Sequence, residues 1–518
     1  MMTRSGCRVL AAHFTFSGDK KMTSHRSTFG KIATTIARRK PRRARVGLFG
    51  VGYHRYWEQF EGLFDELSGY MEVLERSITA HDVEVIGFGM VDNASSAYRI
   101  LPRIKAAQLD LLFCDMLTYA TSSTWGIVIR EIDIPVVLVA LQPLKALDYR
   151  EADTRMQLAN DNICSLPEFA GVAVRMGKKV PPVIIGTLYG DTHAEAELRR
   201  WCDIARVLHD LKGARIGHFG HVLESMLDMH SDPTAFTAAF GCHIVQTEID
   251  DLVRHYREVT EAETRAKTKE ILAMFDTPDP GPDPVTRKLT DTDLRTGARA
   301  AAALDRFIEE HAIDGLAYYY EGEPGSERAG LAANLIVGNS LLTAAGFPMC
   351  GESDLKTCVA MLIMDRLDIG GSFAEFHPVD FNEGFILVGH DGPHHLNIAE
   401  GRPVLRSLVK YHGKPGSGAS VEFKIREGPI TMLSISQTGD GRFKFVIAEG
   451  ESVSGPIPPT GNTNTRALFK PDIRTFLRRW LAEGPTHHFA LGIGHHARSI
   501  ADIAEALGVP HIIVDTDC

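Results

Sequence analysis

The chain has 518 residues, of which 44% are apolar and 24% are charged. These proportions are typical of globular proteins and exclude a mainly disordered, collagen-like or coiled-coil chain. The net charge of −10 excludes recruitment to nucleic acid or anionic lipid through bulk charge. No apolar run is long enough to span a bilayer. At about 150 residues per domain, the length predicts two to four domains.

The eight cysteines are too sparse to form a disulfide scaffold in a chain of this length. They form no Cys-x-x-Cys pair, so neither a zinc ribbon nor a thioredoxin motif is supported. We therefore expect reduced thiols and a cytoplasmic protein.

Residues 1–44 are basic and contain a single acid, Asp19. We predict an extension without fixed structure, and Met22 is a plausible true start. A transit peptide is the alternative, because such segments are basic and poor in acids. The run ARRKPRRAR (37–45) could bind RNA or a membrane surface, but a solvated tail is the preferred interpretation.

From residue 45, short apolar runs alternate with segments of helical spacing, which predicts a parallel sheet covered on both faces. Strands are expected at 46–52, 83–89, 109–115 and 134–141, and helices at 56–78, 95–107 and 123–131.

The same alternation restarts in the middle of the chain, with strands at 181–191, 214–220 and 315–322 and helices at 194–211 and 294–311. The proline- and aspartate-rich segment 276–287 is predicted to be a loop.

Beyond about residue 371, short runs separated by Gly, Pro and Asp predict an antiparallel sheet or barrel. A helix at 497–507 and a strand at 511–515 close the chain. The predicted fold class is α/β, with two Rossmann-like parallel α/β domains (45–185 and 186–370) followed by a β-rich, barrel-like domain (371–518). The glycines of GLFGVG and GHFG fall short of a GxGxxG fingerprint, so no dinucleotide is expected.

Acids and histidines gather at the predicted ends of elements, in YYYEGEPGSE (318–327), CGESDLKTCVAMLIM (350–364), GGSFAEFHPVDF (370–381), VGHDGPHH (388–395), THHF (486–489) and GHH (494–496). Ser353 or Asp354 could simply cap the following helix, and the histidine pairs could be solvated. Glu352 is harder to explain as a cap. Two carboxylates and two imidazoles suit Mn²⁺, Co²⁺ or Fe²⁺, whereas a structural zinc site would be expected to contain cysteine.

Four of these motifs resemble, in order and spacing, those of the L-arabinose isomerase family. GESDLKT (351–357) is similar to its Gly-Glu-Gly-Asp-Trp-Lys-Thr segment and GGSFAEF (370–376) to its Gly-Gly-Thr-Ser-Phe-Met-Glu-Asp segment. LVGHDG (387–392) resembles Leu-Gly-Ser-His-Met, and THHFALGIGHH (486–496) resembles Ala-His-His-Thr. More weakly, GYHRYW (52–57) stands where the family has a Gln-His-Leu-Tyr turn.

The resemblance implies one divalent ion per protomer, Mn²⁺ or alternatively Co²⁺, Fe²⁺ or Mg²⁺. The implied ligands are Glu352, Glu375, His390 and His488, with His487 and His495 as fallback candidates. Glu352 and Glu375 would also be catalytic, one moving a proton between C1 and C2 and the other managing hydroxyl protons.

The sugar-contacting residues depart from the family pattern. Tyr53 (or Gly52) replaces a glutamine, and Thr118 (or Leu117) stands where the family has a histidine. Tyr320 occupies the place of a pocket phenylalanine, and Leu355 follows GESD in place of a tryptophan.

Asp391 follows His390 where the family has a methionine. It is predicted either to accept hydrogen bonds from sugar hydroxyls or to be an exposed salt-bridge partner. L-arabinose itself is therefore doubtful as the substrate.

The sequence thus predicts an aldose–ketose isomerase that works through a cis-enediolate on a small-molecule sugar, with an altered sugar pocket. The alternatives are isomerisation or epimerisation of a different or modified sugar, and a non-catalytic sugar-binding protein. No nucleic-acid or membrane partner is expected. The resemblance implies a homo-oligomer, a tetramer or hexamer, that shares its sites through segment 115–130.

Overall fold

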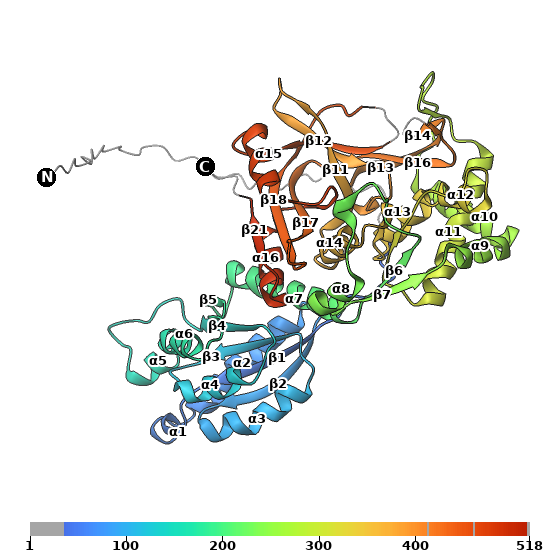
Figure 1. Cartoon of the computed structure of the whole chain (residues 1–518). Coiled ribbons are helices and arrows are strands. Elements are labelled where there is room, and N and C mark those ends of the chain that lie inside the picture. Colours follow the sequence, from blue (N-terminus) through green and yellow to red (C-terminus); the bar gives the residue numbers. More distant parts are fainter. Residues whose placement is uncertain (1–35, 412–413, 459–461, 515–518) are drawn as a thin grey trace, which may run out of the picture. The chain divides into compact units, whose positions relative to one another are not determined.

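The computed structural model describes residues 36–411, 414–458 and 462–514, and Figure 1 shows their arrangement. All of them belong to one compact unit, Ile32–Cys518. No helix among the described residues is both long and apolar enough to cross a bilayer. Most of the predicted N-terminal extension, including Met22, lies outside the described residues.

The described end of that extension, residues 36–44, differs from the solvated tail predicted for it. Arg38 pairs with the buried carboxylate of Asp365, and Lys40 pairs with Asp314. Arg39 donates its backbone N–H to the carbonyl of Ala345 at 2.9 Å. The basic side chains are therefore paired with acids of the same chain, which reduces the charge they present to a polyanion.

The first sheet has five parallel strands, because each strand after β1 is separated from the previous one by a helical segment. In spatial order they are β2 (Glu84–Val91), β1 (Arg45–Val51), β3 (Leu111–Met116), β4 (Val136–Gln142) and β5 (Val183–Thr187). The helices of this part are α1 (Arg55–Gln59), α2 (Leu63–Thr79), α3 (Ala94–Ala106), α4 (Ser122–Arg130), α5 (Thr154–Leu158), α6 (Leu166–Arg175) and α7 (Thr192–Gly213).

Two details differ from the sequence prediction. The single helix expected at 56–78 is divided into α1 and α2, because Gly62 adopts a left-handed backbone with φ of 74° before α2. The strand expected at 181–191 does not begin the second sheet. As β5 it pairs with β4 and completes the first sheet, across the predicted boundary at residue 185.

The second sheet has four parallel strands. In spatial order they are β10 (Met349–Cys350), β9 (Gly315–Tyr318), β6 (Arg215–Phe219) and β7 (His243–Thr247). Its helices are α8 (Pro233–Phe240), α9 (Ile249–Glu258), α10 (Glu261–Met274), α11 (Asp291–His311), α12 (Glu327–Ala332) and α13 (Ile336–Ala344), with a short 3₁₀ turn η1 (Leu227–Met229).

The third sheet is mainly antiparallel and has ten strands. In spatial order they are β21 (His511–Ile513), β18 (Phe443–Val453), β17 (Gly428–Gln437), β20 (Phe489–Ile493), β11 (Gly370–Asp380), β12 (Phe385–His390), β19 (Thr463–Leu468), β16 (Ala419–Ile425), β13 (Ala399–Leu408) and β8 (Thr286–Arg287). Because β18 also pairs with β19, six of these strands close into a ring. The predicted α/β fold with a barrel-like C-terminal part is confirmed, while the domain boundaries remain a prediction.

Helix α14 (Leu355–Arg366) is buried along its whole length. It contacts β9 and β10 of the second sheet and β11, β17 and β20 of the barrel. Its polar side chains can be enclosed because they have partners, such as Arg38 for Asp365. The remaining elements are η2 (Gly351–Ser353), η3 (Leu396–Ile398), α15 (Ile473–Ala482), α16 (Ala497–Leu507) and the small pair β14 (Lys410–Tyr411) and β15 (Lys414–Pro415).

Candidate active site

Three neighbouring barrel strands bring acid and histidine side chains to one place. Glu375 of β11 lies opposite Gly389 of β12, so the next residue, His390, is adjacent to it. On the other side of β11, Ala374 lies opposite Phe489, the first residue of β20, so His488 is also adjacent. Residues far apart in sequence become neighbours because antiparallel pairing fixes their register.

The second sheet supplies Glu352 from the turn η2, directly after β10 and before α14. Glu352 and Ser353 both have left-handed backbones, with φ of 57° and 56°. Such a conformation costs free energy in residues other than glycine and is concentrated at functional sites. The turn places Glu352 at the carboxyl end of a parallel strand, where ligands bind in open α/β sheets.

The predicted ligand atoms lie close together. His390 Nε2 is 3.8 Å from Glu352 Oε1 and 3.9 Å from Glu375 Oε1, and His488 Nε2 is 3.6 Å from Glu352 Oε2. Glu352, His390 and His488 form one group able to hold an ion, and Glu375 joins His487 and His488 in a second, overlapping group.

A divalent cation fits this set of donors. Glu352 Oε2 and His488 Nε2 are both buried and have no hydrogen-bond partner among the described residues. Leaving two such atoms unpaired in the interior is costly, and a cation between them would satisfy both. The mixture of carboxylate oxygen and imidazole nitrogen suits Mn²⁺, Fe²⁺ or Co²⁺.

Asp354 orients His488. Its carboxylate caps α14 by accepting from the backbone N–H of Thr357 at 3.0 Å, and it lies 3.1 Å from His488 Nδ1. Burial opposes ionisation of this carboxyl group, but the contact with His488 and the charge of Lys356 lower its pKa to about 2. An ionised Asp354 holds the proton of His488 on Nδ1 and leaves Nε2 able to bind a cation.

Glu375 forms a pair with His487, whose Nε2 lies 2.7 Å from Oε2 of the carboxylate. Burial raises the pKa of Glu375, but the hydrogen bond from His487 and the charge of His390 outweigh it and bring the pKa to about 2. The same hydrogen bond raises the pKa of His487. The pair therefore offers a carboxylate beside a proton-carrying imidazole.

Phe373, two residues before Glu375 on β11, packs against both ligand imidazoles, whose own ring centroids lie 5.3 Å apart. Its ring centroid lies 4.3 Å from that of His390 and 4.4 Å from that of His488. The fully buried ring restricts both imidazoles and keeps water from their faces.

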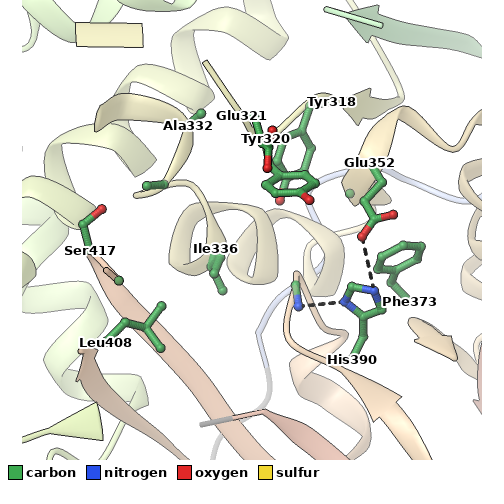
Figure 2. A pocket seen from close by; sticks show the side chains of 14 residues that line it. Tyr318, Tyr320, Glu321, Ala332, Ile336, Glu352, Phe373, His390, Leu408 and Ser417 are labelled. Carbon is green, nitrogen blue, oxygen red and sulfur yellow. Dashed lines mark hydrogen bonds and ion pairs between the residues drawn. The ribbon is translucent and has the colours of Figure 1, made fainter. Parts of the chain in front are cut away.

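A cavity of about 150 Å³ adjoins the site. It is lined by Glu352, His390 and Phe373 at one end and by Leu408 and Ser417 at the other, as Figure 2 shows. Tyr318, Tyr320 and Glu321 also line it. Burial and the charge of Glu352 raise the pKa of Tyr320, so its hydroxyl stays protonated and can donate a hydrogen bond.

Other predicted site residues lie elsewhere. Tyr53 follows β1 of the first sheet, and its ring packs against those of Tyr56 and Tyr119. Thr118 follows β3 of the same sheet and is buried. Neither lines the described cavity. The fallback ligand His495 is half exposed, lies 3.3 Å from the carbonyl of Gly450, and belongs to neither group of possible ligands among the described residues.

Asp391 is an ion-pair partner, but a buried one rather than the exposed one predicted, and its predicted contact with sugar hydroxyls stays a prediction. Its side chain is only 10% exposed, and Oδ1 lies 3.1 Å from His390 Nδ1. It is not among the described residues that line the cavity. With Glu375 and Glu352, it outweighs burial and raises the pKa of His390 to about 9.

Sequence reasoning missed the orienting role of Asp354 and the packing of Phe373 against both imidazoles. Asp354 was interpreted as a helix cap, and it is one. Its second partner, His488, is 134 residues away along the chain. A local sequence pattern cannot predict a contact between residues so far apart. Phe373 had one usable signal, its place two residues before Glu375 on the same face of a strand.

Two family models match the chain: the L-arabinose isomerase central domain over residues 215–370 and the L-fucose isomerase C-terminal domain over residues 390–514. The central and C-terminal parts of the chain thus resemble the arabinose and fucose isomerases. The two matched segments contain three of the four predicted ligands. The fourth, Glu375, lies in the interval between the segments.

Whole-chain comparisons agree with these domain matches. An L-arabinose isomerase of Nocardioides sp. is 28% identical over 424 residues, covering 78% of this chain and 80% of that protein. L-arabinose isomerase of Herpetosiphon aurantiacus is 23% identical and covers 77% of this chain and 79% of that protein. L-arabinose isomerase 1 of Bacillus licheniformis is 23% identical, with coverage of 78% and 80%. By class, the chain is an aldose–ketose isomerase.

Proposed function

We propose that this protein is a metal-dependent aldose–ketose isomerase that works through a cis-enediolate and has a sugar pocket different from that of the L-arabinose isomerases. The observation that carries the proposal is the convergence of two carboxylates and two imidazoles beside a cavity. The unpaired Glu352 Oε2 and His488 Nε2 within that group support a cation rather than a hydrogen-bonded network.

The proposed ligands are Glu352, Glu375, His390 and His488, which hold one divalent ion per protomer, with Mn²⁺ preferred on the donor chemistry. When bound, such an ion acts as a Lewis acid toward two adjacent sugar oxygens and makes the neighbouring C–H bond more acidic. The protein's own contribution is to fix the donors: Asp354 orients His488, and Phe373 restricts both imidazoles.

The two glutamates have different surroundings, which suggests different roles. Glu352 lines the cavity, and this supports assigning to its carboxylate the transfer of a proton from one sugar carbon to the next. Glu375 is turned toward His487 and can pass a hydroxyl proton to and from that imidazole. His487 is 44% exposed, so it can exchange protons with solvent.

The altered pocket is proposed from the residues next to the ligands. Tyr320 lines the cavity and can donate a hydrogen bond to a sugar hydroxyl, which a phenylalanine cannot. Leu355, directly after the Asp354 cap, is buried in the core. A site built to pair a hydroxyl discriminates strongly against substrates that lack it.

We further propose a cytoplasmic homo-oligomer, a tetramer or hexamer, in which a neighbouring protomer completes the site. Tyr53 and Thr118 lie at the carboxyl ends of β1 and β3 in the first sheet and do not line the cavity of their own chain. Thr118 Oγ1 is buried without a hydrogen-bond partner among the described residues. Five of the described cysteines are buried and unpaired, which suits a reducing compartment.

The test is a panel of unphosphorylated aldoses, including L-arabinose and L-fucose, incubated with the chelated protein and with the same protein after Mn²⁺ is restored. The expected result is ketose formation that requires the ion and that is faster with another sugar than with L-arabinose. Ketose formation at equal rate after chelation would contradict metal dependence. Production of an epimeric aldose, or binding without turnover, would favour the two alternative functions.

A further inference from the structure

The ring nitrogen of His390 that faces away from the ligand cluster has two different neighbours. The backbone N–H of Gly392 points at Nδ1 from 3.1 Å, and Oδ1 of Asp391 lies 3.1 Å from the same atom. The first is a hydrogen-bond donor and the second an acceptor. A single ring nitrogen cannot satisfy both, because it either carries a proton and donates or has a lone pair and accepts.

The two contacts correspond to two tautomers with opposite consequences. If Nδ1 accepts from Gly392, the ring proton is on Nε2, which then cannot bind a cation. If Nδ1 carries the proton and donates it to Asp391, the lone pair of Nε2 is directed at Glu352 and Glu375, 3.8 and 3.9 Å away. A ligating histidine is usually fixed by the acceptor on its other nitrogen.

We infer that Asp391 is a positioning residue that selects the cation-binding tautomer of His390 against the competing backbone donor of Gly392. This inference rests on the proposed metal site. It assigns to this chain a carboxylate–imidazole pair at a position where the resembled family has a methionine, which is a much poorer acceptor.

The surroundings hold the two competitors close to the ring. A Cβ atom built on Gly392 would meet His390 Nδ1 at 3.3 Å and the Phe373 ring at 3.5 Å, so a larger residue there would press on the imidazole. The Asp391 side chain is 10% exposed and His390 is 5% exposed, so water competes little for either group. The carboxylate is therefore the acceptor that offsets the Gly392 donor.

The other ligand histidine has the same arrangement, with the Asp354 carboxylate 3.1 Å from Nδ1 of His488. Each of the two imidazoles thus has a carboxylate beside its Nδ1, and Phe373 packs against both rings. The pair at His390 differs in having a backbone donor as a competitor, which makes the proton position there depend on Asp391.

The experiment measures Mn²⁺ binding to the full-length, metal-stripped protein by the paramagnetic resonance signal of the free ion, which does not depend on turnover. The variants are Asp391→Asn and Asp391→Ala, and Glu505→Gln is the matched control. Glu505 is an exposed carboxylate 4.0 Å from His511, so the control removes the same charge beside another histidine. Thermal unfolding of the metal-free variants establishes whether each is folded. If one Asp391 variant does not fold, the other one is sufficient for the test.

Asp391→Ala is expected to raise the Kd for Mn²⁺ by about 10–100-fold and Asp391→Asn, whose amide oxygen is a weaker acceptor, by a smaller factor, while Glu505→Gln leaves the Kd unchanged. If a folded Asp391 variant binds Mn²⁺ with the same Kd as the wild-type protein, the inference is overturned and the proposed metal site stands. An equal loss in the Glu505 control would also overturn it, because long-range charge would then explain the effect. A wild-type chain that binds no Mn²⁺ would overturn the metal site and this inference with it.

Discussion

Replacement of Glu375 by Gln separates the catalytic role of this residue from its structural role. The substitution keeps the shape of the side chain and removes its charge. Three of the four proposed ligands remain, and the barrel register that positions them is unchanged. Because His487 is 44% exposed and can be hydrated when its partner is lost, we expect a stability cost of only about 0–1 kcal/mol.

The effect on turnover should be much larger. Glu375 carries the negative charge that faces both His390 and His487, and general acid–base groups contribute about 10²–10⁴-fold to rates. We expect kcat for ketose formation to fall by at least about 10²-fold, while the unfolding midpoint changes little. Loss of a ligand should also weaken Mn²⁺ binding, so kcat is measured at saturating Mn²⁺.

The assay follows ketose formation on the best sugar of the panel, with thermal unfolding recorded on the same samples. Glu400→Gln is the control, since Glu400 is an exposed acid of β13 paired with Lys424 at 3.3 Å. A Glu375→Gln protein that isomerises at the wild-type rate would refute the assignment of this residue. A large drop in the unfolding midpoint would refute the claim that its role is mainly chemical.

Three further predictions concern stability and assembly. Asp354→Ala should destabilise the metal-free protein more than Asp354→Asn by about 1 kcal/mol in urea unfolding, since Asn still caps α14; equal losses would contradict the capping contribution. Burial raises the pKa of Asp115 to about 8, so the folded state binds more protons than the unfolded state between about pH 4 and pH 8, and stability falls as pH rises by at most about 1.4 kcal/mol per unit. Asp115→Asn should therefore be increasingly more stable than wild type across that window, and parallel unfolding midpoints from pH 4 to pH 8 would refute this. Sedimentation at assay concentration should show an oligomer, and an active monomer would contradict a shared site.

Much of the fold could be predicted because its signals are local. Apolar strands, helical spacing and turn glycines lie within a few residues of one another, and they predicted two parallel sheets and a barrel-like part. The division of the first helix at Gly62 and the sheet that receives β5 were not predictable in the same way. The first depends on one backbone conformation, and the second on which strand edge is available in space.

The sequence by itself determined which residue types could form the site, because two glutamates and two histidines stand in motifs of fixed order and spacing. It could not determine their partners. Asp391 was expected to contact sugar hydroxyls or to be an exposed salt-bridge partner, and only the structure shows that its ion-pair partner is the buried His390. Asp354 was expected only to cap a helix, whereas it also holds His488.

The physical reason is that hydrogen bonding between side chains depends on distance and direction, which strand register and the burial of α14 fix together. The alternation that predicts a strand says which face a residue occupies, but not which residue of another strand lies opposite. Only the pairing of β11 with both β12 and β20 places Glu375 between His390 and His488. The sequence therefore determined which chemical groups are available to this protein, and the tertiary structure determined which of these groups contact one another.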